Sequence, residues 1–296
     1  MHSSIFKNTK PFVKLLVLFG MSLALLLVAS GVQTVLLLSG GGMEDPDMLR
    51  WSQLISQLLM FALPVVLLIL FFEDDGKGFL KADFRGRSWY RALVGVVMLV
   101  LLLPAIDVVT EWNEGWHFGD GVGGTIEEML RKVSDQSKRV IELFLMQEGV
   151  GNLFFNLVVV ALVPAVCEEL FFRCGVQQTL QEWFGNRHWA VVVAAVIFSL
   201  AHFDVFGFVP RVLLGLLLGY LYVYSGSMVV NMSVHFVNNA LIVVLYYLNT
   251  IGVTSIDPED LPSIGWVWTA VCAVAAIFLF YVTFLHKGTG CEREGR

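Results

Sequence analysis

Charged side chains are scarce in this sequence. Asp, Glu, Lys and Arg make up 15% of the 296 residues, whereas hydrophobic residues make up 57%. A soluble globular domain has about 25% charged residues, so this balance excludes one and is typical of a polytopic membrane protein. Dense basic clusters are lacking as well: the formal net charge is −6, and no stretch is basic enough to neutralise several phosphates. We therefore exclude a nucleic acid as a partner and expect an all-α protein in the lipid bilayer.

Cysteine is rare too, and the zinc motif HExxH does not occur. The cysteines are Cys167, Cys174, Cys272 and Cys291; no two form a CxxC pair, and three lie in or beside apolar runs. We interpret them as small buried hydrophobic residues, not as a disulfide framework or a metal site. Internal repeats and low-complexity tracts are also lacking. We therefore expect one integral membrane domain over residues 1–296.

Eight apolar runs are long enough to be membrane helices. Their approximate bounds are Val13–Leu38, Trp51–Phe72, Trp89–Val109, Val150–Gly175, Trp189–His202, Gly207–Tyr224, Met228–Leu248 and Ile264–Leu285. The fifth and sixth runs are short. The first run is either a cleavable signal peptide or an uncleaved anchor, and its length exceeds a signal core of about 7–15 residues, which favours the anchor.

Basic residues in the connections predict the orientation. The N-terminal stretch and the second connection are rich in them: Lys7, Lys10, Lys14, Lys77, Lys81, Arg85, Arg87 and Arg91. The last connection, residues 249–263, has no basic residue, and the tail after it is basic again. By the positive-inside rule, we expect both termini on the cytoplasmic side of the cell membrane.

Residues 110–149 form the one sizeable extramembrane segment. Thr125-Ile126-Glu127-Glu128 resembles a capping box, which would begin a helix at Thr125. Apolar residues follow at helical spacing as far as Phe144 and predict an amphipathic helix at the outer membrane interface. This helix is either a connector packed on the bundle or a gate for a substrate.

A few ionisable side chains lie inside the predicted spans, where they are costly unless they face the protein interior or a wet cavity. The fourth run contains Glu168, Glu169 and Arg173. Glu169 and Arg173 are four residues apart on one helical face and can pair. Glu168 is rotated by about 100° from them and has no obvious local partner. We therefore expect a structural role for Glu169 and a chemical role for Glu168.

The seventh run contributes a polar stripe, because Asn231, His235 and Asn239 follow the spacing i, i+4, i+8. His202 ends the fifth run. At about 1.5 Å per residue from the inner surface, Glu168, His202, His235 and Asn239 all lie about 13–22 Å deep. This common depth predicts a single site.

The chemistry of these groups suits hydrolysis. A partly desolvated carboxylate is a competent general base near neutral pH, so Glu168 with His202 can bind and deprotonate a water. His235 and Asn239 can donate hydrogen bonds to an oxyanion. Zinc is an alternative, because glutamate and two histidines are a known ligand set. A transporter or proton relay that uses the same groups is another.

Two neighbours of Glu168 bear on this interpretation. Pro164 has no N–H, so it frees the carbonyl of Val160 and loosens the helix one turn before Glu168, where a water can enter. Cys167 is a poor candidate nucleophile, because a thiol in apolar surroundings is inert.

Three motifs occur in order over residues 164–239: EExxxR at 168–173, FxxxH at 198–202 and HxxxN at 235–239. In these motifs the chain resembles the CAAX-processing and bacteriocin-processing protease (CPBP or Abi) family, which includes the type II CAAX prenyl endopeptidases. In a membrane helix, EExxxR is quite specific for this family. The other two motifs are weak individually and become specific because all three occur in the same order as in the family. The resemblance covers neither the first three helices nor the last.

The resemblance implies an eight-helix intramembrane endopeptidase with a polar cavity and a protease core at about residues 150–249. By motif position, Glu168 would be the base, His202 its partner, and His235 and Asn239 the oxyanion donors. Glu169 and Arg173 would support the site. The resemblance implies no metal ligand and no cofactor, although a zinc ion remains an alternative. The implied substrate is a peptide or protein, with membrane-anchored and lipidated ones included. A non-proteolytic role, in bacteriocin immunity or as an adaptor scaffold, is the alternative within the family.

Overall fold

The computed structural model describes residue 6 and residues 8–39, 45–83, 86–258 and 262–286. Its regular structure in these ranges consists of helices, without a β-strand. Seven of the helices are long and apolar enough to cross a membrane. The all-α polytopic fold predicted from the sequence is therefore confirmed.

The elements are listed here in chain order. They are α1 (Pro11–Ser39), α2 (Pro46–Gln57), η1 (Leu58–Ala62), α3 (Leu63–Phe72), α4 (Gly76–Leu80), α5 (Gly86–Glu114), α6 (Val122–Leu145), α7 (Val150–Asn156), η2 (Leu157–Leu162), α8 (Val163–Glu169), η3 (Leu170–Gln177), α9 (Gln178–Phe184), α10 (Arg187–Leu200), α11 (Phe208–Ser225), α12 (Met228–Thr250), α13 (Trp266–Phe280) and η4 (Tyr281–Leu285). The η segments are π-helical turns within longer helices, so α2 to α3 form one span and α7 to α9 form another.

The fifth predicted run differs from the other seven. It corresponds to α10, which has only 14 residues. Such a helix is about 21 Å long and does not cross a hydrocarbon core of about 30 Å. His202 follows α10 in the turn before α11, so the short helix delivers this residue to the interior of the bundle.

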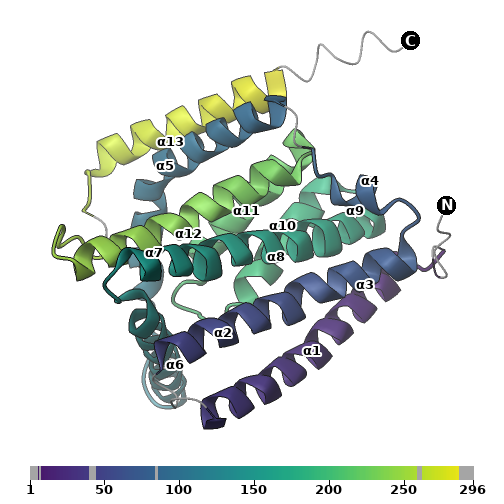
Figure 1. Ribbon diagram of the computed structural model, residues 1–296. Helices are drawn as coiled ribbons and strands as arrows, with labels where there is room; N and C mark the ends of the chain where they lie inside the picture. Colours follow the sequence, from purple (N-terminus) through teal and green to yellow (C-terminus); the bar gives the residue numbers. More distant parts are fainter. Residues whose placement is uncertain (1–5, 7, 40–44, 84–85, 259–261, 287–296) are drawn as a thin grey trace.

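The helix from α7 to α9 lies at the centre of the bundle and runs from Val150 to Phe184, beyond the predicted end at Gly175. A Cβ at Gly175 would lie 2.9 Å from Leu18 Cδ2, so this glycine permits close helix packing and does not end the helix. Figure 1 shows α2 and α3 on one side of this helix and α12 on the other, and α8 packs against both α2 and α12. Residues on α8 therefore face two neighbouring spans.

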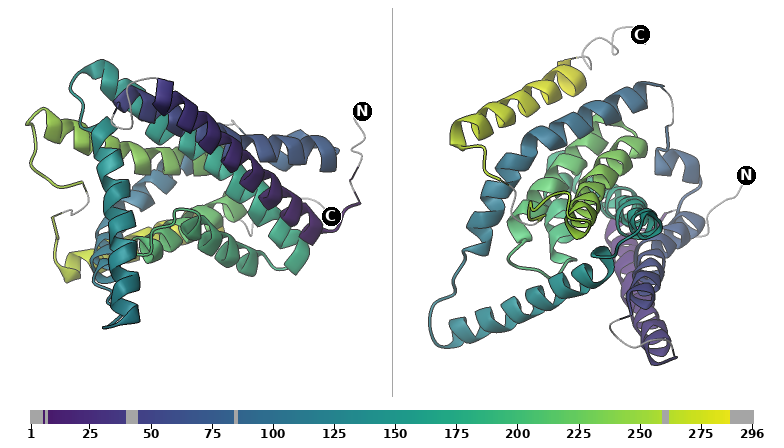
Figure 2. Two further views of the ribbon diagram at one scale, coloured as in Figure 1. Left: turned by 90° about the horizontal axis from the view of Figure 1, so that it is seen from below. Right: turned by 60° about the vertical axis from the view of Figure 1, so that its left-hand side comes forward.

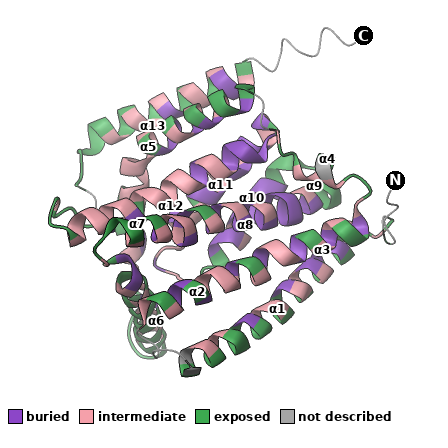
Figure 3. Cartoon of the chain, viewed as in Figure 1, coloured by how far each residue is buried: buried purple, intermediate pink, exposed green. Residues whose placement is uncertain are grey.

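The outer helices present apolar side chains to the surroundings. α1 lies at one edge of the bundle, and α13 lies beside α5 at the opposite edge (Figure 1). Figure 3 shows that buried residues concentrate on the central helices, whereas α1 and α13 have many exposed ones. Large exposed hydrophobic residues such as Leu27, Trp268 and Ile277 suit contact with lipid.

The predicted capping box does not form. α6 begins three residues earlier than expected, at Val122, after Gly121 with a positive φ of 68°. Thr125 lies inside the first turn, where its hydroxyl donates to the Gly121 carbonyl. Glu127 is engaged by the preceding loop, because it accepts a hydrogen bond from the Phe118 N–H. It also accepts one from Arg131 on its own helix. The local motif was therefore overridden by contacts with a segment outside the helix.

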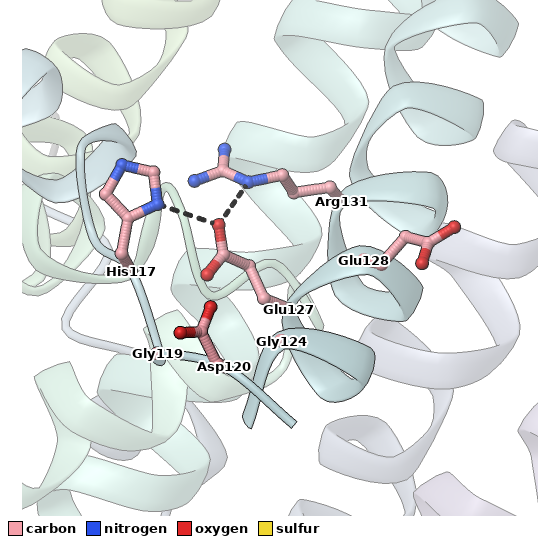
Figure 4. Close-up of a pocket in the computed structure, with 7 residues that line it drawn as sticks. All are labelled: His117, Gly119, Asp120, Gly124, Glu127, Glu128 and Arg131. Carbon is pink, nitrogen blue, oxygen red and sulfur yellow. Dashed lines mark hydrogen bonds and ion pairs between the residues drawn. The ribbon is translucent and has the colours of Figure 1, made fainter. Parts of the chain in front are cut away.

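α6 runs across the direction of the spans at one end of the bundle (Figure 2). A surface pocket of about 450 Å³ surrounds its first turns, and Figure 4 shows Glu127 between His117 and Arg131 there. The Arg131 guanidinium also lies 4.1 Å from the centre of the Phe206 ring. Ser134 donates to Asp204, two residues after His202. α6 thus holds the connection between α10 and α11 in place.

We expect acid to loosen the attachment of the first turns of α6 to the loop that precedes them, because this attachment depends on Glu127. Hydrogen bonds from the Phe118 N–H and then from Arg131 lower the pKa of Glu127 to about 2, from 4.5. Because the folded-state pKa lies below the unfolded one, the stabilisation is present above pH 4.5 and is lost as the pH falls toward 2. Amide hydrogen exchange in residues 122–131, corrected for the intrinsic rate, should accelerate in this window.

Glu127→Gln should show the faster exchange already at pH 7. Glu128→Gln is the matched control, because the exposed Glu128 carboxylate bonds to Lys132 on the same helix face and not to the loop. Equal exchange in the wild type and both variants at pH 7 would show that Glu127 does not hold α6.

Candidate active site

One cavity of about 450 Å³ lies within the bundle, between α2, α8, α10, α11 and α12. The structure brings all four sequence-predicted site residues to it: Glu168, His202, His235 and Asn239. Most of its remaining wall is apolar and includes Val160, Leu214 and Ile242, and α6 contributes Ile141 and Leu145. The cavity combines a small polar centre with apolar walls, as is typical of ligand sites.

Glu168 is buried and faces two partners from other helices. The Nε2 atom of Gln57, on α2, donates to Glu168 Oε1 at 3.0 Å. His235 Nε2, on α12, lies 3.8 Å from Glu168 Oε2. Sequence reasoning missed Gln57, although a signal existed: Gln53 and Gln57 are polar residues four apart in an apolar span, and both line the cavity.

Glu169 is completely buried and accepts hydrogen bonds from three side chains. Arg173 Nε lies 2.9 Å from its Oε2 atom, as expected for residues four apart on one helix. Asn231 Nδ2 donates to the same oxygen at 3.2 Å, and His235 Nδ1 lies 3.1 Å from Oε1. A carboxylate can only accept, so His235 Nδ1 carries a hydrogen and the ring turns Nε2 toward Glu168. Glu169 therefore orients the ring of His235, and Glu168 faces the other nitrogen of that ring.

Arg173 is also fully buried and extends this network to α11. Its Nη1 atom donates to Gln177 Oε1 at 3.2 Å, and Gln177 Nε2 donates to the Gly219 carbonyl at 3.1 Å. A Cβ at Gly219 would lie 2.8 Å from a Val191 methyl group, so only glycine allows this approach of α11. The network joins η3, α11 and α12 behind the cavity.

His202 is exposed to the cavity and follows the end of α10. Its Nδ1 atom lies 2.8 Å from the Phe198 carbonyl oxygen. Because that oxygen can only accept, Nδ1 carries the hydrogen and Nε2 is left for other partners. The Phe198 ring lies 5.0 Å from the His202 ring and 5.9 Å from the His235 ring, between centroids. Phe198 thus sets the position of both rings.

Asn239 lies beside the loosened part of the central helix. The π-helical η2 ends at Leu162, just before Pro164. Asn239 Nδ2 donates to the Val160 carbonyl at 3.5 Å, which is the carbonyl that Pro164 cannot satisfy. Asn238 Nδ2 donates to Asn239 Oδ1 at 3.1 Å. One amide hydrogen of Asn239 is therefore used in the helix contact, and the second is left for a ligand.

The described residues contain no group of three or more His, Cys, Asp or Glu side chains arranged to hold a metal ion. In the cavity, the Nδ1 atoms of His202 and His235 are both occupied by protein acceptors, so a metal would have to use their Nε2 atoms. Cys167 and Cys174 are buried and Cys272 is half-buried, and none of these three lines the cavity. Cys291 lies outside the described residues.

Residues 150–241 match a protein family described as type II CAAX prenyl endopeptidase Rce1-like. The match extends from α7 into α12 and contains all six predicted site and support residues, but it does not contain Gln57. No curated protein and no solved structure matches the chain. The resemblance seen in the three motifs is thereby confirmed: residues 150–241 of this integral membrane protein are similar to a family of CAAX proteases.

The two adjacent glutamates should differ in their importance for stability. Glu169→Gln removes the counter-charge of the buried Arg173, and loss of one partner of a buried ion pair costs about 3–5 kcal/mol. Glu168→Gln keeps the side-chain shape, and His235, unlike Arg173, can lose its proton when the carboxylate is removed, so we expect less than about 1 kcal/mol. Unfolding of the purified protein in detergent, by heat and by denaturant, measures the difference. Similar losses in the two variants would contradict the assignment of separate roles.

Proposed function

We propose that this membrane protein is a CAAX-type intramembrane endopeptidase that hydrolyses a peptide bond with a water activated by Glu168. The observation that supports this proposal is the set of polar side chains around the Glu168 carboxylate. Glu168 is buried, faces His235 and Gln57, and lies in a cavity that also contains His202 and Asn239. The match over residues 150–241 supplies the reaction class.

The proposed reaction begins when Glu168 accepts a proton from the bound water, with His202 as a second partner of that water. The water oxygen forms a bond with the peptide carbonyl carbon, and the carbonyl oxygen becomes an oxyanion. Asn239 and His235 donate hydrogen bonds to this oxyanion. When the C–N bond breaks, Glu168 returns the proton to the leaving amine, so no covalent intermediate with the protein is formed.

The role of His235 depends on its protonation state. Its Nδ1–H is directed at Glu169, so Nε2 can donate to an oxyanion only if the ring is an imidazolium. Glu168 and Glu169 bring two negative charges to the buried cluster, and Arg173 brings one positive charge. A protonated His235 would be the second positive charge and would balance the two carboxylates, as buried charges require. We therefore propose that His235 is protonated before the substrate binds.

The proposed substrate is a peptide or protein segment that reaches into the bilayer. The apolar walls suit an unfolded segment with apolar side chains. Lipidated peptides are therefore tested as substrates together with unlipidated ones. In Figure 1 the start of α1 and the end of α13 lie on the same side of the bundle, with α4 and the connection from α9 to α10. Basic residues of that side, such as Lys81 and Arg187, support the proposed cytoplasmic location of both termini in the cell membrane.

Cleavage of lipidated and unlipidated peptides by the purified protein tests this proposal. Glu168→Gln should lower kcat about 10²–10⁴-fold, since this is the usual contribution of a general base, and His202→Ala should also lower it strongly. Glu128→Gln, on the outer face of α6, serves as the control and should cleave at the wild-type rate. A wild-type rate in Glu168→Gln or His202→Ala would refute the assignment.

The metal requirement is tested in the same assay. We expect an excess of chelator to leave kcat unchanged, because the proposed water is activated by protein groups. Loss of activity in chelator and its recovery with zinc would instead support a zinc-bound water held by the same residues.

A further inference from the structure

Gln57 is the last residue of α2 and lies at the polar centre of the cavity. Its side chain is buried, with 7% of the residue exposed, and its Nε2 atom donates to Glu168 Oε1 at 3.0 Å. Its Oε1 atom is buried as well, and no described residue donates a hydrogen bond to it. The amide cannot be turned round, because an ionised Glu168 can only accept and requires the NH₂ group on its side. The carbonyl oxygen of Gln57 is thus an unused acceptor next to Glu168.

The position of Gln57 is held by the rest of α2. Arg50 lies seven residues earlier, which is two helical turns, and is 2% exposed. Its Nε atom donates to Asn156 at 2.9 Å and its Nη2 atom to the Phe144 carbonyl at 2.8 Å. These bonds fix α2 against α6 and α7. Gln57 therefore faces Glu168 from a rigid helix, as a group that positions a reactant must.

A buried polar atom without a protein partner points to a water or a ligand. Gln57 and Glu168 both line the cavity, so a single water can reach both side chains. A water has two hydrogens. One can be directed at Glu168 and the other at Gln57 Oε1, which turns the lone pair of the oxygen away from both acceptors and toward the cavity.

We infer that Gln57 is a water-orienting residue: its carbonyl oxygen binds the water that Glu168 deprotonates, while its NH₂ group holds the Glu168 carboxylate. This inference rests on the proposed function and extends it to a helix outside the matched residues 150–241. On attack, one water proton moves to Glu168 and the other stays on the newly bound oxygen, hydrogen-bonded to Gln57 Oε1. The residue changes neither charge nor protonation state during the step.

The chain offers a matched control in Gln53. This glutamine precedes Gln57 by one turn and lines the same cavity. Of the two glutamines, Gln57 is the one that donates a hydrogen bond to Glu168. Gln53→Met and Gln57→Met make the same chemical change on the same helix. A general effect of cavity polarity would appear in both variants, and an effect on the water only in Gln57→Met.

Steady-state cleavage of a peptide substrate by the full-length protein tests the inference. We expect Gln57→Met to lower kcat about 10–100-fold, as misplacement of a reactant does, with KM within about twofold of the wild type. Gln53→Met, which removes a polar group from the wall of the same cavity, should lower kcat at least about threefold less than Gln57→Met does. The ratio of rates in H₂O and D₂O should rise in Gln57→Met alone, since proton transfer from a poorly oriented water then limits the rate more strongly.

A second variant, Gln57→Glu, decides the matter even if Gln57→Met fails to fold. When protonated, the introduced carboxyl has one O–H donor for Glu168 and one carbonyl acceptor for the water, as the amide does. When ionised, it repels Glu168 and cannot donate. We therefore expect its activity to be confined to a lower pH range than that of the wild type.

The outcomes separate this inference from the proposed function. A wild-type kcat in Gln57→Met, an equal loss in Gln53→Met, or a wild-type pH profile in Gln57→Glu would overturn the role of Gln57 alone, provided that Glu168→Gln is inactive. A wild-type rate in Glu168→Gln would overturn the proposed function itself.

Discussion

The buried ion pair between Glu169 and Arg173 is the interaction on which the rest of this structure depends. Both side chains are fully buried, and a charge at that depth is stable only if it is paired and hydrogen-bonded. Glu169 also accepts hydrogen bonds from Asn231 and His235 of α12, and Arg173 donates one to Gln177 through its Nη1 atom. The need to satisfy one ion pair therefore fixes α12 and, through Gln177 and Gly219, α11 against the central helix.

The neighbouring Glu168 depends on this arrangement without taking part in it. A rotation of about 100° per residue turns it from the ion pair to the cavity. The same ring of His235 touches both acids, with Nδ1 at Glu169 and Nε2 near Glu168. One glutamate thus provides a rigid support, and the other faces the cavity.

The site is also completed by parts of the chain outside the matched segment. α2 brings Gln57 to Glu168, and its own position is secured by Arg50. α6 lines the cavity with Ile141 and Leu145 and holds the connection that follows His202. The helices outside residues 150–241 therefore shape the same cavity that the three motifs line.

The sequence by itself determined the features that depend on local periodicity. Composition and run length predict an all-α membrane fold, and a spacing of four predicts the Glu169–Arg173 pair, because both follow from the geometry of a single helix. Only the tertiary structure decided which groups meet across helices. The bond from Gln57 to Glu168 and the contact of Asn239 with Val160 arise from packing between segments 111 and 79 residues apart, and the Phe118 loop overrode the local capping motif of α6 in the same way. No local pattern encodes such contacts, because each depends on where another helix lies.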